Sequence, residues 1–270
     1  MEQNRCARMV WWVQMSKDEQ WLLDEKYGGM QSSAFVRDCA RLAKGEPLSY
    51  VIGSASFLSA SIDLSLRPFI PRPETEYWVG EAIATLARER GSRARLRFLD
   101  TCAGSGCIGL ALLQRFPKSS VDFIDTDPRC LKQIAINLER NGIDVSRARI
   151  GEGDLLACAQ GTYDYIFSNP PYIACETAEA RVERSVLAHE PHSALFASER
   201  GLVLIFRLLR EASAHLKPGG ALFVEFDDIQ KEEIERFIKK ETDLKVRFFH
   251  DQYKKWRWLE GVSTDLSTLA

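Results

Sequence analysis

The fold of this chain is decided by residues 96–109, which read LRFLDTCAGSGCIG. Residues 96–100 are mostly apolar and have the length of a short buried strand. Gly104, Gly106 and Gly109 match the pattern G-x-G-x-x-G, in which a glycine turn follows a strand and opens a helix, here predicted over residues 107–116. The order of strand, glycine loop and helix is typical of the first unit of a Rossmann-like sheet.

The same alternation continues towards the C-terminus. Residues 121–125, 163–168 and 221–226 predict further strands, and residues 128–141, 201–216 and 230–240 predict helices. Residues 244–250 and 256–260 predict a final antiparallel hairpin. Because strands that alternate with helices form a mainly parallel sheet covered on both faces, the sequence predicts an α/β fold.

The region before residue 96 has a different pattern. Residues 19–27 and 32–44 have helical spacing and are separated by two glycines. Residues 50–57 and 61–66 predict a β-hairpin, which a proline-rich irregular segment and a helix to about residue 90 follow. We therefore expect a helical domain over residues 1–48, a β-hairpin linker over residues 49–73 and the α/β domain over residues 74–270.

Composition limits the partners and the compartment. The 270 residues carry a net charge of -2, which gives no global electrostatic reason for nucleic-acid binding. The cysteines are odd in number and lack C-x-x-C spacing, which indicates reduced thiols rather than disulfides or a zinc site. The apolar residues 9–13 do not resemble a signal peptide, and no apolar run is long enough to span a bilayer. We expect a cytoplasmic protein that binds no metal, membrane or nucleic acid.

The glycine loop is compatible with two adenosine-containing ligands, a dinucleotide and a methyl donor. Both need a turn that the ligand can approach and a carboxylate for the ribose hydroxyls, and Asp125 ends the second strand at the expected distance. Asp100, at the end of the first strand, favours the methyl donor. A carboxylate there repels a pyrophosphate but suits the α-ammonium group of a methionine moiety, directly or through water.

A second motif, Asn169-Pro170-Pro171-Tyr172, follows the strand at residues 163–168 and decides between these ligands. Ligands of an open α/β sheet lie at the carboxyl ends of the strands, so the motif is expected to face the same crevice as the glycine loop. An amide nitrogen is a poor nucleophile because its lone pair is delocalised. The Asn169 side-chain oxygen and the Pro170 carbonyl are candidate acceptors for its two N–H bonds, and Tyr172 offers a flat face for stacking. The motif therefore predicts methyl transfer to a planar amide or amino nitrogen.

These two motifs together resemble the class I S-adenosylmethionine-dependent amino-methyltransferases. Residues 45–53 (GEPLSYVIG), 70–76 (IPRPETE) and 190–196 (EPHSALF) are similar to one branch, the protein-(glutamine-N5) methyltransferases that modify peptide-chain release factors. The IPRPETE run is far more specific than Asn-Pro-Pro-Tyr, which adenine-N6 DNA methylases share. The resemblance covers nearly all of the chain from residue 45 onwards.

The resemblance implies a fold and a cofactor. The fold is a mostly parallel seven-stranded sheet of the class I methyltransferase type, with a small N-terminal helical domain for substrate recognition and a β-hairpin linker. The cofactor is S-adenosylmethionine, with Asp125 at the ribose and Asp154 and Leu155 along the adenine. The residues expected to hold it are Asp100, Cys102, Ala103, Gly104, Ser105, Gly106, Asp125, Asp154, Leu155 and Asn169.

The resemblance also implies a substrate, the glutamine of the Gly-Gly-Gln motif of class I peptide-chain release factors. Asn169, Pro170, Pro171 and Tyr172 are expected to bind this glutamine, and Asn169, Pro170 and Tyr172 to act in catalysis. The chain departs from the family at Cys102-Ala103, where a Gly-Thr or similar pair is usual. We expect residue 102 to avoid positive φ, which only glycine adopts without a steric cost.

Other function classes are open at this point. A nucleic-acid amino-methyltransferase, acting on adenine N6 or an rRNA base, would use the same pocket but needs a basic face or a recognition domain. An NAD-dependent oxidoreductase explains the glycine loop but not the Asn-Pro-Pro-Tyr motif. A methyltransferase-like binding protein has no need of Asp125, Asp154 and Asn169.

Two smaller signals have structural explanations that we favour. His189 and His192 are interpreted as surface or hydrogen-bonded histidines, because the chemistry needs no strong base. The basic and aromatic residues 253–258 are interpreted as part of a hairpin at the edge of the sheet rather than as a nucleic-acid surface.

Overall fold

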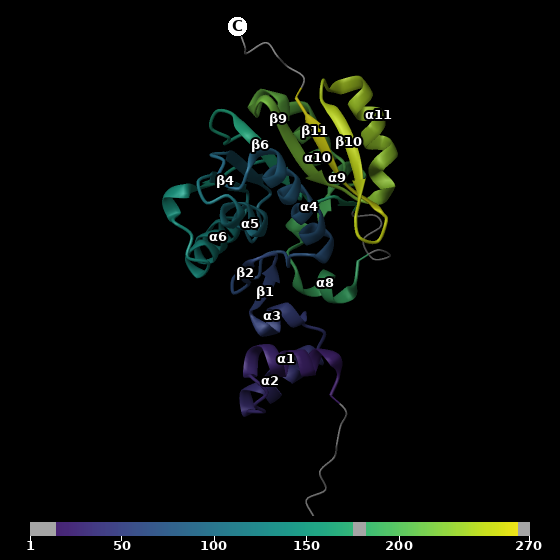
Figure 1. Ribbon diagram of the computed structural model, residues 1–270. Coiled ribbons are helices and arrows are strands. Elements are labelled where there is room, and N and C mark those ends of the chain that lie inside the picture. The colour runs from purple at the N-terminus through teal and green to yellow at the C-terminus, as the bar shows by residue number, and fades with distance from the viewer. Residues whose placement is uncertain (1–14, 175–181, 264–270) are drawn as a thin grey trace, which may run out of the picture. The chain divides into compact units, whose positions relative to one another are not determined.

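The computed structural model describes residues 15–174 and 182–263 (Figure 1). These residues belong to two compact units, which divide the chain between Ile52 and Gly53. The first unit is helical, and the second contains the large sheet.

The N-terminal unit contains the helices α1 (Lys17–Tyr27), α2 (Ser33–Leu42) and α3 (Leu48–Ile52). A capping box formed by Ser16 and Glu19 begins α1, and Gly28 ends it in the left-handed conformation. One apolar core joins the three helices and includes Leu22, Leu23, Phe35 and Val51. This confirms the small helical domain that the sequence predicts.

The prediction of a strand over residues 50–57 is wrong for its first part. Tyr50 and Val51 belong to α3, where their backbone amides donate to the carbonyl of Pro47 at 3.0 and 3.1 Å. Val51 is fully buried in the helical core. Burial against α1 and α2 therefore overrides the preference of a β-branched residue for a strand.

The hairpin consists of β1 (Ser54–Phe57) and β2 (Ala60–Asp63), which pair with each other and not with the large sheet. Side chains of α6 (Pro128–Arg140) and its C-cap accept hydrogen bonds from backbone amides of β2. The Ser61 amide donates to Asn141 Oδ1 at 2.9 Å, and the Asp63 amide donates to Asn137 Oδ1 at 2.6 Å. These bonds fix the direction in which the chain enters the proline-rich segment that follows.

The large sheet has seven strands in the order β10-β11-β9-β6-β3-β4-β5. Adjacent strands from β9 to β5 are parallel, and β11 is antiparallel to both β9 and β10. This confirms the predicted class I methyltransferase architecture with its antiparallel C-terminal hairpin. The strands are β3 (Arg97–Thr101), β4 (Ser120–Asp125), β5 (Ala148–Glu152), β6 (Tyr163–Ser168), β9 (Leu216–Glu225), β10 (Lys245–His250) and β11 (Trp256–Val262).

Helices cover both faces of this sheet (Figure 1). On one face lie α4 (Pro73–Arg90), α5 (Cys107–Arg115) and α6, where Trp78 of α4 stacks on Phe167 and Trp258. On the other face lie α10 (Val203–Glu211) and α11 (Lys231–Glu241), whose apolar side chains pack with Ile166. Neighbouring residues of β6 thus point to opposite faces, as the pleat of a strand requires.

Some elements differ from the predictions. The edge strand β5 has no clear signal in the sequence because none of its residues is fully buried. The helix predicted over residues 201–216 ends as α10 at Glu211, a 3₁₀ turn follows, and β9 already begins at Leu216. Between β6 and α10 the structure adds α8 (Arg184–His189), the two-residue strands β7 (Ile173–Ala174) and β8 (Phe196–Ala197), and the short α9 (Ser198–Gly201).

Candidate active site

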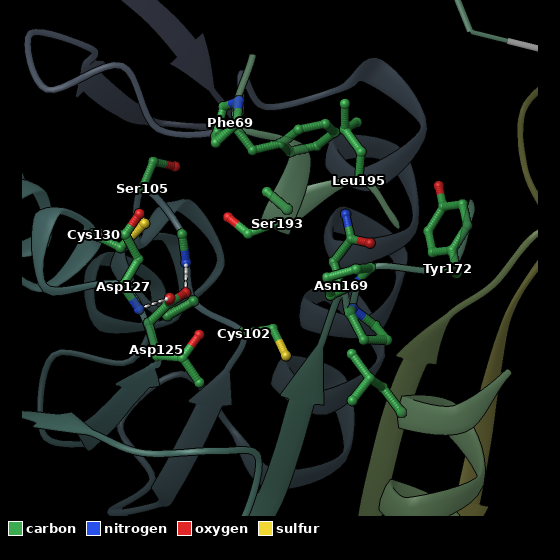
Figure 2. A pocket seen from close by; sticks show the side chains of 18 of the residues that line it. Phe69, Cys102, Ser105, Asp125, Asp127, Cys130, Asn169, Tyr172, Ser193 and Leu195 are labelled. Atoms are coloured by element: carbon green, nitrogen blue, oxygen red, sulfur yellow. Dashed lines mark hydrogen bonds between the residues drawn. The ribbon is translucent and has the colours of Figure 1, made fainter. Parts of the chain in front are cut away.

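A pocket opens at the carboxyl ends of β3, β4 and β6, where an open α/β sheet binds its ligands. Figure 2 shows Ser105, Asp125 and Asp127 along one side and Asn169 and Tyr172 along the other. The two sequence motifs therefore line one pocket, as the sequence analysis expects. The predicted residues on its wall are Cys102, Ala103, Gly104, Ser105, Asp125, Asp154, Leu155, Asn169, Pro170, Pro171 and Tyr172.

The glycine loop turns tightly between β3 and α5. Gly106 has φ 80° and is the N-cap of α5. Gly109 lies inside the helix, where an added Cβ atom would stand 2.2 Å from the ring of Phe123. The last glycine of the motif therefore allows α5 to pack closely on β4, while the turn exposes the loop to the pocket.

The expectation that residue 102 avoids positive φ is wrong. Cys102 has φ 56°, in the left-handed region that costs a non-glycine residue about 1–2 kcal/mol. Its neighbour Ala103 donates from its amide to the carbonyl of Ile124 at 3.1 Å, which holds the start of the loop against β4. The loop therefore keeps its tight first turn, and the surrounding hydrogen bonds offset the strain.

Asp125 ends β4 with its carboxylate facing the pocket (Figure 2). Its Oδ2 accepts from the Gly104 amide at 2.8 Å, and its Oδ1 accepts from the Asp127 amide at 2.9 Å. Burial raises the pKa of Asp125, and these amide hydrogen bonds oppose the rise. Since a carboxylate has about four acceptor positions, each oxygen keeps one for a ligand hydroxyl.

Asp100 lies beneath the loop and is not among the described residues that line the pocket. It is 1% exposed, and its Oδ2 accepts from the Gly109 amide at 2.9 Å. Its Oδ1 is buried and has no hydrogen-bond partner in the described part of the chain. Burial raises the pKa of Asp100 to about 8, and the hydrogen bond from the Gly109 amide opposes this rise. Gly106, the N-cap of α5, is also not among the described residues that line the pocket.

Asp154 and Leu155 reach the pocket from the segment after β5. The Arg207 guanidinium of α10 donates to Asp154 Oδ2 at 2.8 Å, in a pair that is partly open to solvent. Leu155 is buried, and its carbonyl accepts from the Thr101 hydroxyl at 2.9 Å. These two residues give this part of the wall an apolar surface with an acid at its edge.

The Asn169–Tyr172 segment forms the other side of the pocket, directly after β6. The Asn169 Nδ2 donates to the Thr75 hydroxyl oxygen at 3.1 Å, and the Tyr172 hydroxyl donates to Glu225 Oε1 at 2.7 Å. Burial raises the pKa of Tyr172 well above its usual value, so this hydroxyl stays protonated. Both side chains are thereby held by residues outside the motif.

Two further segments cover the pocket (Figure 2). Phe69 comes from the proline-rich segment before α4, and Leu195 comes from the loop before β8. Glu190 is buried and joins these segments, because its carboxylate accepts from the Ile70 amide at 3.1 Å and from Arg72 at 2.6 Å. The segments with the most specific sequence resemblance therefore form the cover of the site.

Sequence reasoning missed Phe69, Thr75, Ser193 and Leu195 on the pocket wall, and Glu225 behind it. Glu225 has a recognisable signal, a single carboxylate near the end of the apolar run ALFVEF, residues 221–226. A charge in such a run has to be paired when it is buried. Phe69 and Leu195 lie in irregular segments, where periodicity carries no information. Thr75 lies in the first turn of α4 and Ser193 in a 3₁₀ turn, and neither has a sequence pattern that marks it as a wall residue.

The structure places His192 and residues 253–258 in the structural contexts that we favoured. His192 forms a 2.8 Å hydrogen bond with the Leu187 carbonyl and is not among the described residues that line the pocket. Residues 253–258 lie in and after the turn between β10 and β11, and Trp258 is buried between Trp78 and Phe249. Within the described ranges, no cluster of three metal-ligating side chains occurs. None of the helices described there is long and apolar enough to cross a membrane.

Comparison with known proteins adds independent support. Residues 82–201 match the family model of the methyltransferase small domain. The chain is 35% identical to the release factor glutamine methyltransferase of Koribacter versatilis, over 77% of this chain and 72% of that protein. It is 35% identical to the Streptococcus pneumoniae enzyme of the same name, over 83% of this chain and 77% of that protein. The chain is also 34% identical to a 4-amino-L-phenylalanine/4-methylamino-L-phenylalanine methyltransferase of Streptomyces pristinaespiralis, over 77% of this chain and 70% of that protein.

Solved structures agree on the fold. A methyltransferase from Pyrococcus furiosus has a TM-score of 0.55 at 20% identity and covers 84% of this chain and 97% of its own. A T. thermophilus 16S rRNA methyltransferase, solved with AdoMet and guanosine, has a TM-score of 0.53 at 18% identity. The match covers 78% of this chain and 49% of that one. The identity to the curated relatives extends over most of both chains, in addition to the shared fold. The chain therefore belongs to the family of release factor glutamine methyltransferases.

Proposed function

We propose that this protein transfers a methyl group from S-adenosylmethionine to the side-chain amide nitrogen of a glutamine in class I peptide-chain release factors. The observation that carries the proposal is the single pocket in which Asp125 and the glycine loop face Asn169 and Tyr172. A donor bound along the loop and an amide bound at Asn169 would share this pocket. Proximity of this kind supplies much of the rate of a bimolecular transfer.

The residues on the donor side fit S-adenosylmethionine. Asp125 keeps two acceptor positions for the ribose hydroxyls, and Asp154 and Leu155 offer an acid and an apolar surface for the adenine. The buried Asp100 beneath the loop leaves one oxygen without a described partner, which a water-mediated contact to an ammonium group would satisfy. When bound, S-adenosylmethionine supplies an electrophilic methyl group on sulfur.

The residues on the acceptor side fit a planar nitrogen that carries two hydrogens. The Asn169 oxygen and the Pro170 carbonyl accept its two N–H bonds and turn its π face towards the donor. The ring of Tyr172 lines the same wall and is held by Glu225. The S–CH3 bond would break as the N–CH3 bond forms, leaving S-adenosylhomocysteine, and the methylated nitrogen would lose one proton to water. Because a methylated, positively charged amide nitrogen is strongly acidic and these residues act by orientation, the chain needs no strong base in the pocket.

A free aromatic amine is the second candidate acceptor, since one relative takes its name from 4-amino-L-phenylalanine. Its nitrogen is also planar and carries two hydrogens, so Asn169 by itself does not separate it from glutamine. The greater similarity to the release factor enzymes favours the protein substrate. The adenine-N6 and rRNA alternatives have no comparable support, and the net charge of -2 argues against a polyanion.

We also propose that the N-terminal unit recognises the release factor. Trp21, Met30 and Val36 are 59%, 73% and 64% exposed on this small unit, and tryptophan is enriched among the residues that carry binding energy at protein interfaces. Replacing all three by alanine is expected to raise the KM for the intact factor at least ~10-fold and to leave the KM for a short Gly-Gly-Gln peptide unchanged. Ile229→Ala is the control, because Ile229 is 63% exposed on the other unit. An equal loss with both acceptors would contradict the docking role.

The function is tested with a methyl-labelled donor and separate acceptors. The protein is incubated with a class I release factor, with the same factor carrying glutamate in place of the Gly-Gly-Gln glutamine, with 4-amino-L-phenylalanine, and with DNA and rRNA. We expect label in the unmodified factor alone. Label in the amine would favour the second candidate, and label in nucleic acid with an unlabelled factor would contradict the proposal.

A further inference from the structure

A buried carboxylate lies directly behind the acceptor side of the pocket. Glu225, the last residue of β9, is 1% exposed and accepts hydrogen bonds from three side chains. Its Oε2 accepts from the Thr75 hydroxyl at 2.7 Å and from Trp78 Nε1 at 2.6 Å. Its Oε1 accepts from the Tyr172 hydroxyl at 2.7 Å. Glu225 therefore connects the first turn of α4 with the acceptor motif.

The charged form of Glu225 sets the direction of the hydrogen bonds that lead to the pocket. An ionised carboxylate can only accept, so the single hydroxyl hydrogen of Thr75 is given to Glu225. The Thr75 oxygen is then an acceptor for its other neighbour, Asn169. The amide of Asn169 must present Nδ2, which lies 3.1 Å from that oxygen. Its Oδ1 is left for the acceptor substrate.

Three hydrogen-bond donors and a nearby cation stabilise the charged form of Glu225. Burial raises the pKa of Glu225 above its usual value, and the hydrogen bonds from Thr75, Trp78 and Tyr172 offset part of that rise. The positive charge of Arg257 lowers it as well. Arg257 is itself fixed, since its Nε donates to the buried Asp251 carboxylate at 3.1 Å. A buried carboxylate with three donors and a nearby cation is an arrangement that a charged group needs in a protein interior.

We propose that Glu225 and Thr75 are positioning residues that fix the Asn169 amide with its oxygen towards the pocket, so that the site selects acceptors with N–H bonds. This inference rests on the proposed function and adds the origin of its selectivity. An asparagine amide has two orientations of similar shape, and hydrogen bonds decide between them. With the oxygen outward, glutamine donates to Asn169. A glutamate carboxylate in the same place meets an oxygen and is repelled.

Thr75→Val tests this relay, because valine keeps the shape of threonine and removes its hydroxyl. Without that acceptor, Asn169 is free to turn its NH2 group towards the pocket. We expect kcat with a Gly-Gly-Gln peptide to fall ~10-fold and the Kd of S-adenosylmethionine to change less than about 2-fold. Thr75→Ser keeps the hydroxyl, and its kcat is expected to stay within about 3-fold of the wild-type value.

A second measurement separates positioning from a general structural effect. A Gly-Gly-Glu peptide is used as a competitive inhibitor, and its Ki is divided by the KM of the Gly-Gly-Gln peptide. We expect Thr75→Val to lower this ratio ~10-fold, since the turned amide now favours a carboxylate. Thr75→Ala is measured in parallel and is expected to lower the ratio in the same direction. Thr85→Val is the matched control, as Thr85 lies on the same helix but not on the pocket wall.

The outcomes distinguish this inference from the proposed function. If the wild-type protein methylates neither the factor nor the peptide, the proposed function is wrong. If the wild type is active and Thr75→Val keeps its kcat or its Ki-to-KM ratio, the relay is wrong while the function stands. A parallel loss of donor affinity and kcat in Thr75→Val would also contradict the relay, because it would indicate general damage to the pocket.

Discussion

The carboxylate of Asp125 offers a quantitative test of the donor site. Its two oxygens each accept one backbone amide, from Gly104 and Asp127, and each keeps one acceptor position for the pocket. We consider Asp125→Ala, which removes both free positions. Two hydrogen bonds of about 1–1.5 kcal/mol each give a loss of about 2–3 kcal/mol, or ~30–150-fold in affinity for S-adenosylmethionine.

Isothermal titration calorimetry measures this loss on the folded variant. Glu152→Ala is the matched control, because Glu152 is the register partner of Asp125 on β5 but is exposed and not on the pocket wall. It removes the same charge from the same edge of the sheet, and we expect it to change the Kd less than about 2-fold. A thermal unfolding curve for each variant separates donor binding from loss of the fold.

Two results would refute this reasoning. Wild-type affinity in a folded Asp125→Ala protein would show that the carboxylate does not contact the donor. An equal loss in Glu152→Ala would show that the effect comes from net charge and not from hydrogen bonds. Tighter binding of NAD than of S-adenosylmethionine by the wild type would exclude the methyl donor as the natural ligand of the glycine loop.

Three further predictions follow from the site and the core. Asn169→Ala should lower kcat roughly 10²–10³-fold and leave the Kd of S-adenosylmethionine within a few-fold, as single-turnover kinetics and calorimetry would show. Gly109→Ala should destabilise the protein by about 1–3 kcal/mol in urea unfolding, because its Cβ atom meets the Phe123 ring at 2.2 Å. Burial by itself raises the pKa of Asp38, but hydrogen bonds from Lys26, Tyr27 and Arg41 lower it to about 2. A carboxyl pKa that is lower in the folded than in the unfolded protein stabilises the folded state at pH values above the unfolded pKa. The free energy of unfolding should therefore fall by about 2 kcal/mol as the pH falls from about 4 to about 2. Asp38→Asn should remove this pH dependence.

The sequence predicts the centre of the fold better than its borders. The glycine loop and the apolar runs of β3, β4 and β6 are local signals, and the structure places them as expected. The edge strand β5 has no such signal because its residues are half-buried or exposed. Residues 50–52 form a helix because Val51 packs into the core of the first unit, which depends on contacts that no local pattern contains.

The candidate site follows the same division. Asp125 and Asn169 follow strands, so the rule for open α/β sheets is sufficient to bring them together. Thr75 and Glu225 are 150 positions apart, and their 2.7 Å hydrogen bond depends on the packing of α4 against β9. The left-handed Cys102 is a similar case, since the hydrogen bonds around the loop determine a conformation that its residue type disfavours.

The methylated atom itself is the most direct test of the account. A class I release factor is reacted with S-adenosylmethionine and the wild-type protein, then digested and sequenced by tandem mass spectrometry. We predict a single added methyl group, on the side-chain nitrogen of the Gly-Gly-Gln glutamine, that is nearly absent with Asn169→Ala over the same time. A methyl group on another residue, or an unmodified factor beside methylated 4-amino-L-phenylalanine or nucleic acid, would contradict the account.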